Sequence, residues 1–161
     1  MIRNIPTRYT SVSFMDLLVE HEFEKGSFDF FYLPMDFKTG KNVGYGFINF
    51  TNALSTIIFV SKFQNRQLKV LTSKKSLSLV PSKRQGLLQN LAIFHNSDLL
   101  NSSSCSPFYK PIVLRNGDLV PLDNQLFKLF MNDTRSGYDV TAVKDSTAAT
   151  PAPQVLAVPS F

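Results

Sequence analysis

The residues best suited to chemistry in this sequence are aromatic rings placed at alternate positions. The chain has 15 Phe, 5 Tyr and no Trp, and eight of these aromatics fall within residues 28–50. The densest segment, residues 44–50, reads GYGFINF. Side chains alternate between the two faces of a strand, so Tyr45, Phe47 and Asn49 would share one face. Aromatic rings on an open sheet face can stack on flat ligands such as nucleic-acid bases.

The sequence lacks the residue sets that catalysis or metal binding would need. It contains one cysteine, Cys105, and two histidines, His21 and His95. These are too few for a zinc site built from Cys or His. No nucleophile is paired with a base in a recognisable motif, and no glycine-rich phosphate loop occurs. We therefore expect no enzymatic activity, no cofactor and no bound metal.

The strands and helices that would position the aromatic residues can be inferred from the spacing of apolar residues and from the positions of Pro and Gly. Four segments have the length and composition of strands, namely residues 2–5, 28–33, 44–50 and 76–80. Between them, one helix is predicted from a capping box at Ser13 and Asp16 to near Gly26. A second helix is predicted over residues 53–63. Its inward-facing side chains would be Ile57, Val60 and Phe63. A turn at residues 36–40 joins the two central strands.

The order βαββαβ predicts an α+β fold of the ferredoxin-like kind. In this arrangement a four-stranded antiparallel sheet carries both helices on one face. The opposite face is then free to bind a ligand. A third helix, opened by a capping box at Ser82 and Gln85 and ending near His95, would complete a domain of residues 1–96.

Two further regions follow the predicted domain. Residues 97–138 form an extension in which Asn116-Gly117 predicts a tight hairpin near residues 112–122. Residues 139–161 are rich in Ala, Thr and Pro and have neither helical nor strand period. Such a segment buries too little apolar surface to offset its ordering entropy, so we expect a disordered tail.

Strand parity assigns the remaining aromatic residues to faces of the sheet. In the segment 28–33, Phe31 and Leu33 would point towards the helices, and Phe30 and Tyr32 towards the open face. A slip of one residue would invert this assignment. On the first strand, Arg3 would also lie on the open face, where a guanidinium can stack on a base or bind a phosphate.

Residues 43–50, VGYGFINF, resemble the octapeptide of the RNA recognition motif, K/R-G-F/Y-G/A-F-V-x-F/Y. Five positions match outright and Ile48 is a conservative replacement, whereas Val43 stands where the motif has a basic residue. Residues 1–6, MIRNIP, resemble the companion hexapeptide. There Met1 occupies the position that usually carries an aromatic residue, which removes one stacking platform.

A closer resemblance rests on three segments, MIRNIP, FDFFYLPMDFKTGKNVGYGFINF and SKRQGLLQNLAIFHNSDL. They are similar to the carboxy-terminal RNA recognition motif of the Mei-two-like family, over about residues 1–114. The resemblance implies that the domain binds RNA and that the third helix belongs to it. It also suggests a role in post-transcriptional regulation during meiosis or development.

Charge is distributed unevenly along the chain. Residues 1–110 hold 13 Lys and Arg against 7 Asp and Glu, a net charge of +6, whereas residues 111–161 have a net charge of −1. A positive domain favours an anionic partner. Charge alone is also consistent with solubility. Together with the aromatic strand and the resemblance to the RNA recognition motif, it leads us to expect single-stranded RNA as the partner. The expected RNA-binding residues are Tyr45, Phe47, Arg3, Tyr32, Phe30, Asn49, Lys41, Lys83 and Arg84.

An alternative is a protein-interaction module of the same fold whose sheet face is covered by the extension. Met1, Val43 and the apolar segment 87–94, which could lie across the sheet, all favour it. The accessibility of Tyr45 and Phe47 discriminates between the two hypotheses. No apolar run approaches the roughly 18 residues of a membrane helix, and the amino end has no signal-peptide pattern. We expect a monomer in the nucleus or cytoplasm, neither membrane-bound nor secreted.

Overall fold

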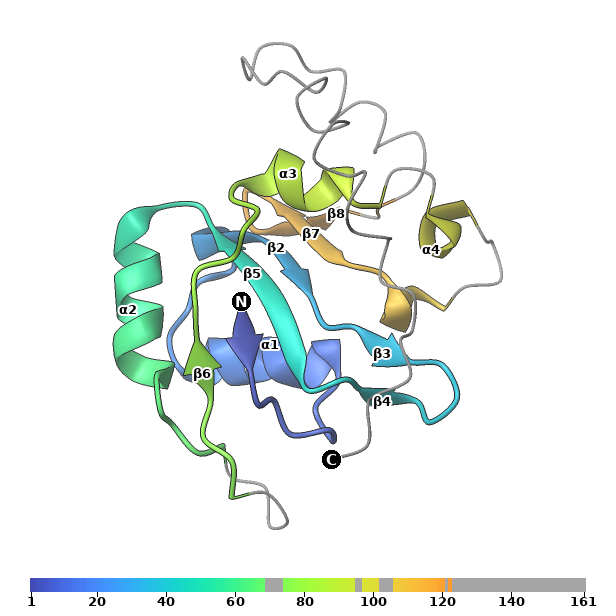
Figure 1. Ribbon diagram of the computed structural model, residues 1–161. Coiled ribbons are helices and arrows are strands. Elements are labelled where there is room, and N and C mark those ends of the chain that lie inside the picture. Colours follow the sequence, from blue (N-terminus) through green and yellow to red (C-terminus); the bar gives the residue numbers. More distant parts are fainter. Residues whose placement is uncertain (69–73, 95–96, 102–105, 121, 123–161) are drawn as a thin grey trace.

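The computed structural model describes residues 1–68, 74–94, 97–101, 106–120 and 122, which form a six-stranded antiparallel sheet with helices on both faces (Figure 1). The strand order is β6-β1-β5-β2-β7-β8, and a separate two-stranded sheet pairs β3 with β4. The strands are β1 (Ile2–Arg3), β2 (Phe28–Tyr32), β3 (Met35–Asp36), β4 (Lys41–Asn42), β5 (Tyr45–Phe50), β6 (Ser78–Leu79), β7 (Ile112–Arg115) and β8 (Asp118–Val120). The helices are α1 (Ser11–Glu20), α2 (Ala53–Phe63), α3 (Leu87–Ala92), α4 (Asp98–Asn101) and the 3₁₀ turns η1 (Lys25–Ser27) and η2 (Pro107–Tyr109).

The predicted ferredoxin-like fold is confirmed by the centre of this sheet. Strands β6, β1, β5 and β2 are the four that the sequence predicted, and α1 and α2 occupy the two predicted crossovers. All their pairings are antiparallel, with Ile2 opposite Gly46 and Phe31 opposite Ile48. The first strand is shorter than expected, because Asn4 adopts a left-handed conformation with φ of 62° directly after Arg3.

Helix α1 begins and ends earlier than the sequence predicted. Thr10 is the N-cap: its Oγ1 accepts a hydrogen bond from the Ser13 backbone N–H at 3.1 Å, while the Thr10 N–H donates to Ser13 Oγ at 2.9 Å. Ser13 is therefore the last residue of a capping box, at position N3, rather than its first. The helix ends at Glu20 instead of near Gly26, because Glu22 turns the chain with a φ of 63°.

Helix α2 has the predicted bounds but a different inward face. Phe63 is buried as expected, whereas Ile57 is 64% exposed and Val60 is 42% exposed. The buried partner of Phe63 is Phe59, one turn away, with the two ring centroids 4.8 Å apart. The helix is apolar on several sides, so its spacing alone could not select a face. The two large aromatic rings are buried because they remove the most apolar area from water.

The core between the sheet and α1 and α2 is built largely from phenylalanine. Phe14 of α1 stacks on Phe31 of β2 with centroids 5.2 Å apart, and Phe50 of β5 packs on Phe59 at 5.0 Å. Ile2, Leu18 and Leu33 complete its centre. Phe31 and Leu33 therefore face the helices, as strand parity predicted.

The described part of the extension, which includes β7 and β8, continues the sheet. The predicted hairpin is present, with Asn116 and Gly117 between β7 and β8. Strand β7 pairs with β2, so that Val113 lies opposite Phe30. β2 is therefore an internal strand and not the edge strand that a four-stranded sheet would make it.

Helix α3 starts later than predicted and lacks the expected capping box. Its N-cap is Gly86, with a φ of 81°, and the Gln85 side chain donates to the Ser82 carbonyl at 2.6 Å. The helix ends at Ala92. Cys105, His95 and the predicted tail of residues 139–161 lie outside the described residues. Among the helices that the structure describes, none has the length and apolar character needed to cross a membrane.

Candidate nucleic-acid interface

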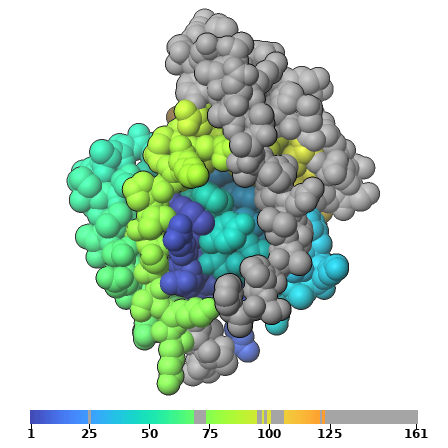
Figure 2. All heavy atoms as spheres, in the orientation of Figure 1, coloured from blue at the N-terminus to red at the C-terminus, as the bar shows by residue number. Residues whose placement is uncertain are grey.

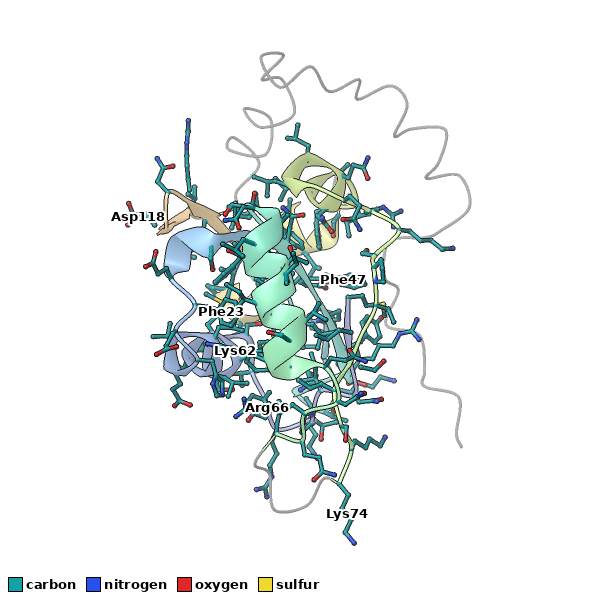
Figure 3. The ribbon with its side chains drawn as sticks, turned by 90° about the vertical axis from the view of Figure 1, so that its left-hand side faces the viewer. Phe23, Phe47, Lys62, Arg66, Lys74 and Asp118 are labelled. Atoms are coloured by element: carbon teal, nitrogen blue, oxygen red, sulfur yellow. The ribbon has the colours of Figure 1, made fainter. Side chains whose placement is uncertain are left out.

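Strand β5 carries Tyr45 and Phe47 on the sheet face that points away from α1 and α2. Figure 3 places Phe47 on the opposite side of the sheet from Phe23, which belongs to the helix-side core. Both rings are half-buried, and they meet edge to face with centroids 5.8 Å apart and an interplanar angle of 82°. Two rings thus remain partly accessible side by side, as a stacking site for bases requires.

Gly46, between these two rings, is buried on the helix side of the sheet. A Cβ atom at this position would lie 3.1 Å from the Tyr32 carbonyl oxygen and 3.3 Å from Ile5 Cδ1. Any larger residue would push β5 away from β2 or displace Ile5. The glycine of the octapeptide therefore allows the close approach of β5 to β2 and Ile5. The flanking rings project from the other face because side chains alternate along a strand.

Arg3 adds a cation to the same face. Its backbone lies opposite Tyr45 on one side and opposite Ser78 on the other, so these three residues share one face of the sheet. The Arg3 side chain is exposed. In Figure 2 atoms of β1 and β5 are visible on this face, and the segment from β6 to α3 borders them on one side. Arg3, Tyr45 and Phe47 share this side of β1 and β5, and we call them the open half of the sheet face.

Phe30 and Tyr32 lie on this face too, but the expectation that they are exposed is wrong. Their exposed fractions are 1% and 5%. The Phe94 ring, just after α3, packs edge to face on Tyr32 with centroids 5.0 Å apart, and its centroid lies 6.3 Å from that of Phe30. Together with Leu91 and Val113 they form a second apolar core. This covered half of the face cannot stack on RNA while α3 is in place.

Asn49 has a structural role that the sequence did not reveal. Its Nδ2 donates to Asp29 Oδ1 at 2.8 Å, and its Oδ1 accepts from the Gly86 backbone N–H at 3.0 Å. Asn49 thereby ties β5 to β2 and to the start of α3. Partial burial raises the pKa of the Asp29 carboxyl above its ordinary value, although the hydrogen bond from Asn49 opposes this shift.

Apart from Arg3, the predicted lysine and arginine contacts lie on segments adjoining the open half and not within it. Lys41 is exposed on β4, four residues before Tyr45. Lys83 is exposed and Arg84 is half-buried, both on the connection from β6 to α3. Cations at such positions can contact phosphates on either side of stacked bases. Among the described residues, no group of three or more His, Cys, Asp or Glu side chains could hold a metal ion.

The apolar residues of 87–94 were the feature of the sequence that indicated coverage of part of the sheet face. Leu87, Leu91 and Phe94 now pack on Phe30 and Tyr32. The sequence did raise the possibility that this segment crosses the sheet, as part of the protein-interaction alternative. The segment covers only half of the face, and this depends on the pairing of β7 with β2. No local pattern in the sequence predicts that pairing.

Comparison with known proteins identifies relatives that share this domain. Protein MEI2-like 2 of Oryza sativa subsp. japonica is 42% identical over 108 residues, covering 66% of this chain and 12% of the relative. Protein MEI2-like 5 of the same species is 35% identical over 144 residues, covering 87% and 17%. Protein MEI2-like 1 of Arabidopsis thaliana is 39% identical over 108 residues, covering 66% and 12%. The chain thus spans less than a fifth of the length of these relatives.

A solved structure, that of the Rna15 RRM with bound RNA (GU), overlaps 53% of this chain and 83% of that chain. Its TM-score of 0.44 and its sequence identity of 23% are too low to carry an argument about function. Residues 1–95 match the family described as RNA recognition motif 2. This match includes α1, α2, the whole open half and α3. The resemblance to Mei-two-like proteins is confirmed, and the chain belongs to the RNA recognition motif 2 family.

Proposed function

We propose that this domain binds single-stranded RNA by stacking bases on Tyr45 and Phe47, with Arg3 contacting a phosphate or a further base. The observation that carries the proposal is that these three side chains keep accessible surface on one sheet face, although α3 packs on Phe30 and Tyr32 of the same face. Family membership supports RNA as the ligand. Each base stacked on an aromatic ring contributes about 1–3 kcal/mol.

The positive charge of the described domain supports the same ligand. Lys41, Lys83 and Arg84 lie on segments adjoining the open half and would meet the phosphates of an extended strand. Binding that uses such contacts weakens as salt concentration rises, because counterions released from the RNA must be recovered. We propose that the domain acts in post-transcriptional regulation, in meiosis or development, and in the nucleus or cytoplasm.

The test is titration of random-sequence single-stranded RNA with the parent protein and a Tyr45→Ala, Phe47→Ala variant. We expect the variant to bind at least about tenfold more weakly, since two stacking platforms are lost. Both side chains are only half-buried, so thermal denaturation should show that the variant remains folded. Equal affinity of the two proteins would refute stacking on this face.

An Arg3→Gln variant and a matched Arg115→Gln variant separate local contact from net charge. Arg115 is also exposed, but it lies opposite Asp118, which Figure 3 places far from Phe47. The Arg3 variant should bind more weakly and show a smaller salt dependence, whereas the Arg115 variant should bind like the parent. Equal losses in both variants would indicate a general charge effect.

A second candidate function, a protein-interaction module, is favoured by the burial of Phe30 and Tyr32 beneath Phe94. Coverage of the whole face would make RNA stacking impossible. Because Tyr45 and Phe47 keep accessible surface, we place this function second. It becomes the better explanation if RNA titration shows no difference between the parent and the double variant.

A further inference from the structure

A second cluster of aromatic residues, Phe37, Phe108 and Tyr109, lies outside the sheet face. We call it the aromatic patch. Phe37 is 52% exposed and Phe108 is 63% exposed, while Tyr109 is half-buried. Isolated apolar side chains on a surface are ordinary. Here Phe37 contacts Tyr109 from a distant segment, and Phe108 is the neighbour of Tyr109 in the chain. Such a group of rings is typical of a binding site.

The aromatic patch joins the turn between β3 and β4 to the 3₁₀ turn η2. The Phe37 and Tyr109 ring centroids are 4.6 Å apart and the rings are tilted by 34°. These residues are 72 positions apart in the sequence. Their contact therefore brings the extension, which contains η2, against the loop that precedes the motif strand (Figure 1).

Both segments are held by their own hydrogen bonds, so the backbone positions that carry the rings are ordered. In the first turn, Asp36 Oδ1 accepts from the backbone N–H of Lys38 at 2.8 Å and of Thr39 at 2.9 Å. These bonds keep the pKa of the Asp36 carboxyl below its ordinary value. In η2, the Tyr109 N–H donates to the Ser106 carbonyl at 3.0 Å. Ordered turns reduce the entropy lost when a ligand binds.

The charge around the patch favours an anionic ligand. Lys38 and Lys41 are exposed on the β3–β4 hairpin, and Lys110, half-buried, directly follows η2. The carboxylate of the hairpin, Asp36, is engaged by backbone N–H groups of its own turn. Aromatic rings interleaved with lysines match the bases and phosphates of single-stranded nucleic acid, whereas a purely apolar peptide would gain nothing from the lysines.

The patch is also continuous with the open half of the sheet face. Strand β4 leads directly into β5, and only Val43 and Gly44 separate them. Tyr45 is four positions after Lys41, so their Cα atoms are at most about 14 Å apart. In Figure 1 the β3–β4 hairpin extends from the end of β5 at which Tyr45 begins the strand. An RNA strand leaving Tyr45 at this end would pass the lysines of the hairpin.

We propose that the aromatic patch is a second stacking site, which holds a flanking nucleotide of the same RNA strand that binds Tyr45 and Phe47. The inference rests on the proposed function and extends it. Short RNAs would occupy only the open half, and longer ones would reach Phe37 and Phe108 as well. Affinity should therefore rise with RNA length, and the patch should account for that rise.

The experiment compares random-sequence RNAs of about four and about ten nucleotides, lengths within the range that one single-strand-binding domain covers. In a Phe37→Ala, Phe108→Ala variant we expect the longer RNA to bind about tenfold more weakly, with the affinity for the shorter RNA unchanged. The matched control is a Leu54→Ala, Ile57→Ala variant, which removes exposed apolar surface from α2 and should bind both RNAs like the parent.

The outcomes separate this inference from the proposed function. The Tyr45→Ala, Phe47→Ala variant should lose affinity for both lengths, and its failure to do so would overturn the proposed function. If that variant behaves as expected but the Phe37, Phe108 variant binds the longer RNA like the parent, the second stacking site is wrong and the patch is better explained as a protein contact. Weaker binding of both lengths by the patch variant would also contradict the proposal.

A Lys38→Gln, Lys110→Gln variant provides an independent test, because it leaves the rings in place. Its affinity for the longer RNA should fall less steeply with salt concentration than that of the parent, since fewer counterions are released on binding. For the shorter RNA the two salt dependences should coincide. An unchanged salt dependence with the longer RNA would contradict a path for the strand across the patch.

Discussion

Asn49 links the strand that carries the motif to the segment that covers half of the sheet face. Both ends of its amide are engaged, one by the Asp29 carboxylate and one by the Gly86 N–H. Strand parity correctly predicted the face on which Asn49 lies. Its role could not be predicted, because Gly86 is 37 residues away and only the packing of α3 brings it close.

Replacing Asn49 by Ala should destabilise the fold by about 1–3 kcal/mol, because a partly buried carboxylate and a backbone N–H would lose their partner. Urea denaturation measures this change. Thr51→Ala is a suitable comparison, since it also removes hydrogen bonds between a β5-adjacent side chain and the backbone near β2, but on the exposed surface. If Asn49→Ala lowers the free energy of unfolding no more than Thr51→Ala does, the hydrogen bonds that link β5 to β2 and α3 contribute little to stability.

Replacing Asp29 by Asn keeps an oxygen that can accept the Asn49 hydrogen bond but removes a partly buried charge. Burial raises the pKa of Asp29, so the folded protein binds this proton more tightly than the unfolded chain does. Asp29 therefore stabilises the fold less as pH rises through this pKa. We expect the variant to be at least as stable as the parent at neutral pH, with its advantage shrinking towards about pH 3.

Urea denaturation of both proteins across this pH range provides the measurement. Using the difference between variant and parent cancels the titration of the other carboxyl groups, Asp36 included. A variant whose advantage grows as the pH falls would show that the Asp29 carboxyl is not disfavoured by burial.

At the scale of elements, helix α3 decides how much of the sheet face a ligand can reach. The period-two pattern of β2 correctly placed Phe30 and Tyr32 on that face, and the residues of 87–94 showed an apolar stripe. Exposure is a different property from orientation, because it depends on what packs against the strand from elsewhere in the chain. The inward face of α2 was mispredicted for a related reason. Ile57 and Phe59 are both apolar, so the spacing of apolar residues does not distinguish them, and the larger ring of Phe59 is the one buried in the core.

Shortening the buried ring after α3 tests whether this helix belongs to the folded unit. Phe94→Leu should lower the free energy of unfolding by about 1–3 kcal/mol, since the smaller side chain leaves part of the space against Phe30 and Tyr32 unfilled. Leu54→Ala on the exposed surface of α2 should change it by no more than about 0.5 kcal/mol. Equal, small effects of both substitutions would mean that α3 is not firmly docked.

At the scale of the whole molecule, the sheet has a packed layer on each face, and the buried aromatic residues are shared between these two layers. The phenylalanines beneath the sheet form the core with α1 and α2, and those under α3 form a second core with β7. The sequence predicted the central four strands and both large helices, because their patterns are local. It did not predict that the sheet would continue through β7 and β8. The paired residues of β2 and β7 are about eighty positions apart, and neither segment has a local pattern that identifies its partner.

The most direct test of RNA stacking is to follow the aromatic side-chain NMR resonances of the protein during titration with single-stranded RNA. Bases stacked on Tyr45 and Phe47 should shift the resonances of these two rings strongly through their ring currents. Phe30 and Tyr32, buried beneath Phe94, should shift much less. Largest shifts at Phe30 and Tyr32, or none at Tyr45 and Phe47 when RNA is saturating, would contradict the proposed interface.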